Sequence, residues 1–191
     1  MNNKKHVLAG LLLAASIGVT GTAFASSGHD AHVHGAGALN VVVEGKDVAM
    51  ELTLPGADVV GFEHKAENET DIKAVRDALD TLESAANIFA LPAKAGCEVV
   101  EAHAESSLLE DKGNQVHTDE HKHENQSEPR HGDFAAVYAF ECASPDALRD
   151  IEVKLFVLFP SLEEVMVQTV TAKGQWAKEL TPSDNRFLLV F

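Results

Sequence analysis

The sequence predicts an α+β protein dominated by strands, built as two similar β-rich halves around a pseudo-twofold axis, with one long helix in the first half. Several short stretches alternate apolar and polar residues with period two, as strands with one buried face do. One stretch, at about 68–91, has apolar residues at the three- and four-residue steps of an amphipathic helix. His34-Gly35 and His131-Gly132 each lead into a strand-like stretch, which suggests a divergent internal duplication.

Residues 1–25 have the features of a signal peptide. Lys4 and Lys5 are followed by the apolar run Val7–Val19 and by small residues at Ala23–Ala25. The apolar run is shorter than the roughly 20 residues that cross a bilayer, and a buried N-terminal helix is the less favoured alternative. We therefore expect a protein that is exported to a bacterial periplasm and is not inserted in the membrane.

The chain is acidic, with a formal net charge of -15 over its 191 residues. Such a charge repels phosphate groups and argues against nucleic acids and anionic lipids as partners. The residues after the signal peptide suit one domain or two small packed halves. We expect a monomer.

The first half, 26–103, is expected to start with a histidine-containing arm and to continue in two strands. These strands are Gly37–Gly45 and Asp47–Gly56, and the glycine-containing turn Glu44–Asp47 joins them as a hairpin.

The helix at about 68–91 follows this hairpin. Asn68 or Thr70 can cap its start, and Pro92 ends it. A further strand is expected at Gly96–Glu105.

Residues 104–130, between the halves, are rich in acidic and amide side chains and in histidine, without apolar periodicity. Such a stretch cannot bury enough apolar surface to fold alone, so we expect a disordered, metal-binding loop.

The second half, 131–191, restarts with a strand at His131–Cys142. Lys154–Gln168 is expected to form a strand, a proline break and a second apolar stretch. Gln175–Leu180 offers at most a turn or two of helix, and Arg186–Phe191 reads as a last buried strand.

The chain has two cysteines, Cys97 and Cys142. In an oxidising compartment a single pair usually forms one disulfide, which would close a loop containing the histidine-rich stretch. The alternative, two thiolate metal ligands, lacks the C-x-x-C spacing of zinc sites.

Four histidines from three separated places are candidate ligands of one zinc site. His32 and His34 lie two residues apart, so in an extended arm both point to one side. His34 and His131 each open a strand, and these starts would converge near a pseudo-twofold axis. His64 follows the second strand. Imidazole is a common ligand of tetrahedral zinc and is mostly neutral at pH 7, although each histidine alone reads equally well as a capped or solvated residue.

The loop offers a second, weaker kind of binding. Its auxiliary ligands are His103, His117, His121 and His123, with carboxylates among them. Because binding must also order the chain, we expect modest affinity and fast exchange; a plain solvated linker is the alternative. Cleavage after Ser26 would place His29 third in the mature chain. A free N-terminal amine with histidine at the third position chelates copper or nickel strongly. Cleavage after Ala25 places this histidine fourth and weakens the motif.

Enzyme motifs are absent: the sequence has no H-E-x-x-H, no G-x-S-x-G, no P-loop and no dinucleotide fingerprint. Glu63 beside His64 could act as the base of a zinc hydrolase. We nevertheless expect no enzyme.

The signal peptide, "HVHGAGALNVVVEG", "GFEH", "HGDFAAVYAFEC" and the His-acidic insert together resemble the ZrgA-type periplasmic zinc-uptake proteins of Gram-negative bacteria. The resemblance covers the chain after the signal peptide. It implies a protein that captures zinc and assists its delivery to an ABC-type importer. It also implies metal binding at His32, His34, His64 and His131, with Glu63 as a partner that orients an imidazole. A copper or nickel buffer, or less readily a zinc-dependent hydrolase, would use the same residues.

Overall fold

The structure is a computed structural model and describes residues 34–109 and 132–190. The signal peptide and most of the expected loop therefore lie outside the described residues. The described residues belong to one compact unit, which spans 32–191. Within this part of the chain, no helix is long and apolar enough to cross a membrane.

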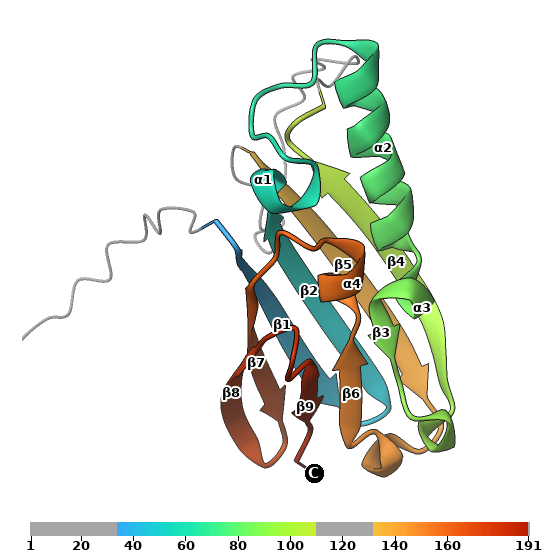
Figure 1. Ribbon diagram of the computed structural model, residues 1–191. Helices are drawn as coiled ribbons and strands as arrows, with labels where there is room; N and C mark the ends of the chain where they lie inside the picture. The colour runs from blue at the N-terminus through green and yellow to red at the C-terminus, as the bar shows by residue number, and fades with distance from the viewer. Residues whose placement is uncertain (1–33, 110–131, 191) are drawn as a thin grey trace, which may run out of the picture. The chain divides into compact units, whose positions relative to one another are not determined.

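The main element of the fold is a six-stranded sheet with the strand order β4-β5-β2-β1-β7-β8 (Figure 1). Its central hairpin is β1–β2, as the sequence predicts. β1 pairs with β7 in parallel, and the remaining pairs are antiparallel. The strands are β1 (Ala36–Glu44), β2 (Asp47–Pro55), β4 (Cys97–Ser106), β5 (Asp133–Cys142), β7 (Glu164–Thr171) and β8 (Gly174–Leu180).

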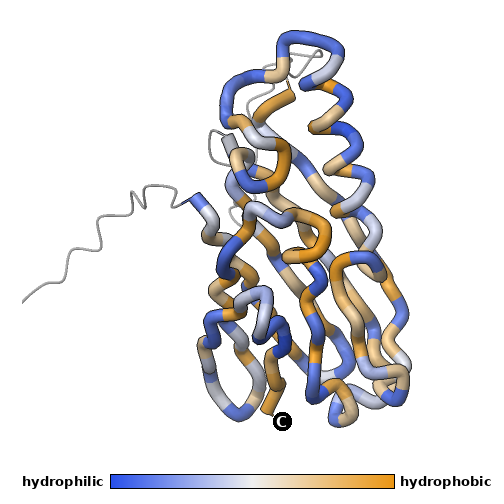
Figure 2. The backbone as a smooth tube through the Cα atoms, in the orientation of Figure 1, coloured by the Kyte–Doolittle hydropathy of each residue, from blue (hydrophilic) through white to orange (hydrophobic). Residues whose placement is uncertain are grey.

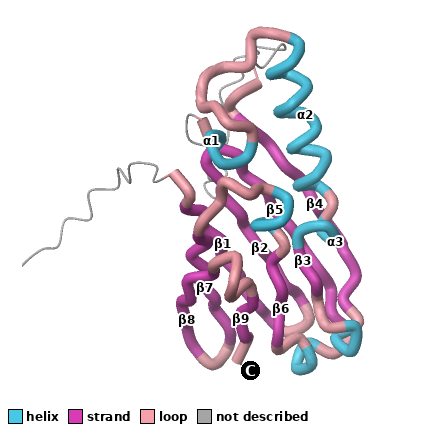
Figure 3. Tube along the Cα trace, viewed as in Figure 1, coloured by secondary structure: helices cyan, strands magenta, loops and turns pink. Residues whose placement is uncertain are grey.

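A three-stranded sheet and four helices complete the described fold (Figure 3). The small sheet has the order β3-β6-β9, and its strands are β3 (Phe89–Ala90), β6 (Asp150–Val153) and β9 (Arg186–Leu188). The helices are α1 (Gly56–Val59), α2 (Glu69–Glu83), α3 (Ala85–Ile88) and α4 (Leu155–Leu158), with short 3-10 turns η1 (Ala93–Ala95) and η2 (Pro145–Ala147).

The core lies between the large sheet and the layer formed by the helices and the small sheet, which lie on one face of the large sheet (Figure 1). Period-two alternation produces this arrangement: in β1 and β2, every second residue is buried and its neighbours are exposed. Figure 2 shows the same alternation of hydropathy along the chain. The most deeply buried residues of the hairpin are Leu39, Val41, Val48, Met50, Leu52 and Leu54.

The fold class is confirmed: the protein is α+β and dominated by strands, and α2 is its one long helix among the described residues. The strands of the two expected halves share one sheet, because β1 and β2 of the first half lie between β5 and β7 of the second. Whether the halves arose as copies stays a prediction.

The predicted helix at about 68–91 is too long at its C-terminal end. Asn68 caps the start as expected, since its side chain accepts the N–H of Asp71. Ser84, however, has a non-helical ψ of 84° and ends α2. After the short α3, Phe89 pairs with β6 and packs edge-on against the Tyr138 ring at 5.1 Å. This tertiary packing, which periodicity does not reveal, turns the chain out of the helix.

Three further expectations differ from the structure: two concern the second half, and one concerns the loop that precedes it. The strand expected after Lys154 is helix α4, which Lys154 precedes as N-cap, and the helical turns expected at Gln175–Leu180 are strand β8, which pairs with β7. The loop expected from Ala104 begins later, because β4 continues to Ser106 in register with β5. Edge pairing supplies the backbone hydrogen bonds in the last two cases.

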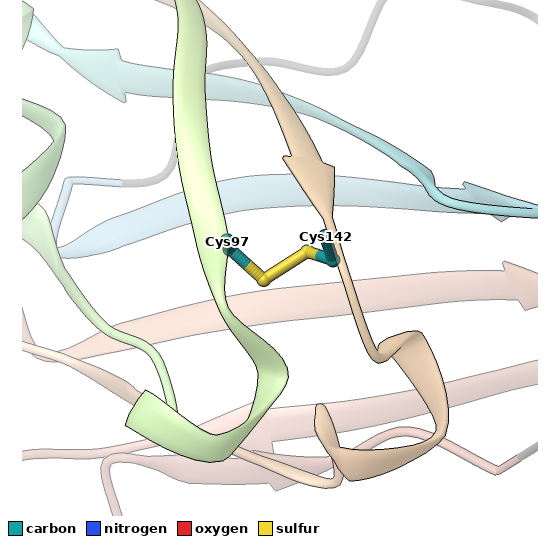
Figure 4. The surroundings of a disulfide bond; sticks show 2 residues. All are labelled: Cys97 and Cys142. Carbon is teal, nitrogen blue, oxygen red and sulfur yellow. A yellow bond between two sulfur atoms is a disulfide. The ribbon is translucent and has the colours of Figure 1, made fainter.

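Cys97 and Cys142 form the expected disulfide (Figure 4). The two residues are direct partners in the β4–β5 register, and their Cα atoms lie 3.9 Å apart. The bridge therefore fixes the end of the β4–β5 pair opposite to the end from which residues 110–131 depart.

Candidate metal centre

The two strands that follow His-Gly pairs, β1 and β5, both start at the same end of the large sheet. β2 runs antiparallel to both of its neighbours, β1 and β5, so the start of β1, the end of β2 and the start of β5 lie together. Pro55, the last residue of β2, is the register partner of Asp133, the first residue of β5. α1 follows Pro55 directly and reaches both strand starts.

Gly35 is held on both of its backbone polar groups. Its N–H donates to Oδ2 of Asp58, in α1, at 2.7 Å. Its carbonyl accepts the N–H groups of Glu163 and Glu164, both at 2.8 Å. The φ of +86° explains why glycine stands here. These bonds fix the backbone immediately after His34.

Gly132 is held by the same short helix. Its carbonyl accepts the N–H of Gly56 at 2.7 Å, and its φ is +93°. A Cβ atom on Gly132 would lie 3.2 Å from Cβ of Glu63. Glu63 is therefore packed against the residue that follows His131.

His34 and Glu63 face each other across this end of the sheet. Nε2 of His34 lies 3.4 Å from Oε1 of Glu63. The His34 side chain is 68% exposed and the Glu63 side chain is 37% exposed, so the pair is open to solvent. An exposed pair of this kind contributes little to stability by itself, and its residues are available for another role.

The ring of His64 is held in a defined orientation. It stacks on Phe62, with ring centroids 4.7 Å apart and an interplanar angle of 16°. Its Nδ1 lies 2.9 Å from the Lys65 carbonyl. A carbonyl can only accept, so Nδ1 carries the hydrogen and the neutral ring presents its lone pair at Nε2. Metal-binding histidines are commonly oriented in this way.

Only part of the predicted site falls within the described residues. His34, His64 and Glu63 do; the remaining predicted ligands, His32, His131, His117, His121 and His123, lie outside them. Within ranges 34–109 and 132–190, no three His, Cys, Asp or Glu side chains are arranged to hold one metal ion.

His103 lies in β4, within the strand expected at Gly96–Glu105. Its Nδ1 is 3.4 Å from Oε1 of Glu83, at the end of α2. Its register partner is Val137, four residues into β5 from Asp133. His103 is therefore separate from the strand-start end where His34 lies.

The sequence interpretation missed Asp58. This carboxylate is 7% exposed and connects α1 to the start of β1. An aspartate inside the apolar stretch after Pro55 was the available signal, because a buried carboxylate needs a hydrogen-bond donor.

The fold and this end of the sheet define a strand-dominated protein with an intrachain disulfide and with imidazole and carboxylate groups exposed side by side. The chain belongs to the ZrgA family: the model of that family, described as "ZrgA family zinc uptake protein", matches residues 31–189. The match confirms the resemblance and associates the protein with zinc uptake, which points to a role in transport. No individual curated protein matches the chain.

Proposed function

We propose that this protein captures zinc in the periplasm with His34, His64 and Glu63, together with His32 and His131, and passes it to an ABC-type importer. The pair of His34 and Glu63 carries the proposal. Two atoms bound to one tetrahedral zinc at about 2.0–2.1 Å lie about 3.3 Å apart. The measured separation of Nε2 and Oε1 is 3.4 Å, which suits a shared ion without a large movement.

The orientation of His64 supports the same site. Its Nδ1–H is engaged by the Lys65 carbonyl, which leaves Nε2 as the ligand atom. His64 follows Glu63 directly in the chain, so a small change in this segment can bring its ring to an ion held by Glu63.

The position of Gly132 supports the participation of His131. Gly132 packs against Glu63, and consecutive Cα atoms are about 3.8 Å apart. His131 precedes Gly132 directly in the sequence, which is why we include it among the ligands. Likewise, His32 is two residues before His34 on the arm that leads into β1.

Exposure of the pair supports transfer rather than storage. A ligand that is 68% exposed can be approached by the ligands of a second protein. Zinc uptake is what the family name states, and a disulfide suits an oxidising compartment outside the cytosol. In this proposal the histidines of 104–130 collect further zinc with lower affinity.

Zinc titration calorimetry of the chain from Ser26 tests the proposal. His34→Ala and Glu63→Ala should each weaken the tightest zinc site by at least tenfold, because each removes one ligand. His103→Ala is the matched control, since it removes a similarly exposed imidazole that is paired with a carboxylate elsewhere. The assignment would be refuted if all three variants lowered the zinc affinity equally, or if none of them lowered it. Competition with Cu²⁺ and Ni²⁺ in the same cell tests the alternative of a copper or nickel buffer.

A further inference from the structure

The six-stranded sheet has one face on which no described element packs. The helices and the small sheet lie on the opposite face (Figure 1). The strand positions of the bare face alternate with the buried ones and are exposed or half-buried, except for Pro55 and Asp133 at the β2–β5 end, which are buried. We call this surface the outer face.

Two rows of the outer face carry mostly small and apolar side chains, and a polar row with Glu51, Asn40 and Gln168 lies between them. The register places Ala139 beside Ala49 and Val42, and Ala135 beside Thr53 and Ala38. Four large apolar side chains are more than a third exposed there: Val42 (45%), Val137 (38%), Met166 (40%) and Val170 (37%). Solvent-facing strand positions are usually polar, so this number of exposed apolar side chains on one sheet face favours an interaction surface.

Carboxylates lie among and around these rows. Along the outer-face positions of the described strands there is no Lys or Arg, and His103 is present. The acidic residues at these positions are Glu44, Asp47, Glu51, Glu98, Glu101, Glu105, Glu141, Glu164 and Glu179. The face therefore combines exposed apolar side chains with a strong excess of carboxylates.

A hollow of about 190 Å³ lies within the outer face, between β4 and β1. Its lining includes Ala135 and Val137, three carboxylates and one imidazole; these polar groups belong to Glu51, Glu101, Glu105 and His103. An extended Lys or Arg side chain matches this hollow, because its methylene groups can lie on the alanine and valine while its charged end meets the carboxylates.

We propose that the outer face docks a partner protein that presents Lys or Arg side chains beside apolar ones. Charge complementarity selects this occupant, since opposite potentials steer and orient association. A second copy of this chain would bring two acidic faces together, and like charges facing each other are unfavourable. Anionic lipid is excluded for the same reason.

The outer face continues to the strand starts that carry the candidate metal centre. Ala36, an outer-face residue of β1, is two residues from His34, and its register partner on β7 is Glu164. A docked protein would thus lie beside the exposed His34 and Glu63 pair. Handover of zinc at this position rests on the proposed function, whereas the docking itself does not.

Site-specific photo-crosslinking in the host cell tests the docking. Benzoylphenylalanine replaces Val137 on the outer face or, as the control, Val157, which is 82% exposed on α4. We expect one adduct with a different protein from position 137 and none from position 157. Equal adducts at both positions, no adduct at 137, a dimer of this chain, or a crosslink within the chain would each overturn the proposal.

Charge reversal then separates docking from zinc binding. Glu51→Lys with Glu101→Lys should abolish the adduct from position 137 and weaken binding of the purified partner at least tenfold, an effect that added salt should reproduce. Glu67→Lys with Asp80→Lys makes the same change in net charge on exposed residues outside the outer face and should leave the adduct intact. If the adduct survives the first pair, the docking proposal fails. Zinc titration of both pairs reports on the proposed function separately, because neither removes a proposed ligand.

Discussion

Oδ2 of Asp58 accepts the backbone N–H of Gly35 at 2.7 Å. This bond joins α1 to the start of β1, one residue after His34. On the other side of α1, Gly56 donates its N–H to the Gly132 carbonyl at 2.7 Å. A helix of four residues thus holds both Gly35 and Gly132, the glycines that lead into β1 and β5.

Removal of the Asp58 carboxylate should loosen this arrangement. Asp58→Ala leaves the Gly35 N–H without its acceptor, at a cost of roughly 1–3 kcal/mol in the free energy of unfolding. Zinc affinity should fall as well, because His34 is no longer held. Asp58→Asn keeps an oxygen acceptor and should lose less of both. Denaturant unfolding and zinc titration measure the two effects; an affinity that stays unchanged in Asp58→Ala argues against a positioning role.

A methyl group at Gly132 should disturb Glu63. The φ of +93° disfavours alanine, and the new Cβ would lie 3.2 Å from the Glu63 Cβ. Gly132→Ala should therefore cost at least about 1 kcal/mol in stability and also weaken zinc binding. The control is Gly45→Ala, where φ is also positive but nothing lies within 4 Å of the new atom. It should lose stability and keep its zinc affinity; parallel losses of affinity would count against the contact with Glu63.

The Cys97–Cys142 bridge should contribute substantially to stability. The cysteines are 45 residues apart in sequence, and loops of that length correspond to typical gains of about 2–4 kcal/mol. The double variant Cys97→Ser, Cys142→Ser should lose this amount in urea unfolding. Its zinc stoichiometry should stay the same, because the bridge lies at the opposite end of β5 from Gly132. Lost zinc sites in a folded variant would favour thiolate ligation instead.

Tyr138 should make the protein sensitive to alkali. Burial raises the pKa of its phenol above the ordinary value, and the charge of Glu83 adds to this shift. The unfolded chain therefore releases the phenolic proton near pH 10 while the folded chain retains it. Stability is fully present below pH 10 and falls by about 1.4 kcal/mol per pH unit above it.

The contribution of Tyr138 to this loss can be isolated. Tyr138 is the chain's single tyrosine, so tyrosinate absorbance reports on it alone. Tyr138→Phe removes the bond from its hydroxyl to the Leu82 carbonyl, at a cost of about 1 kcal/mol, and should abolish the component of the alkaline decline due to this group. A tyrosinate signal from the folded protein at pH 10 would contradict the assignment.

Local patterns predicted much of the fold. The alternation in Ala36–Glu44 and Asp47–Pro55 gave the central hairpin, and Asn68 gave the start of α2, because both depend on nearby residues. The break at Ser84 and the strand Gly174–Leu180 depend on packing against Tyr138 and pairing with β7. Such contacts join distant parts of the chain, so periodicity alone does not reveal them.

The zinc ligands stay a prediction, whereas the structure explains why the two strand starts lie together. Two His-Gly pairs at strand starts led to the prediction that their histidines share one ion. The order β5-β2-β1 supplies the reason, since β2 places the starts of its two antiparallel neighbours at one end. The roles of Asp58 and Gly56 depend on the path of α1, which no local pattern encodes.

The most direct test replaces residues 110–130 by a short Gly/Ser linker and titrates zinc into this variant and the full chain. The described ends Leu109 and Gly132 keep their places in this design. If the end of the sheet is the zinc receptor, the variant should keep one tight site with an affinity within about threefold of the full chain and lose only weaker sites. If the variant that carries the linker binds no zinc at all, the histidine-rich loop is the receptor, and the assignment of the site to His34 and Glu63 is wrong.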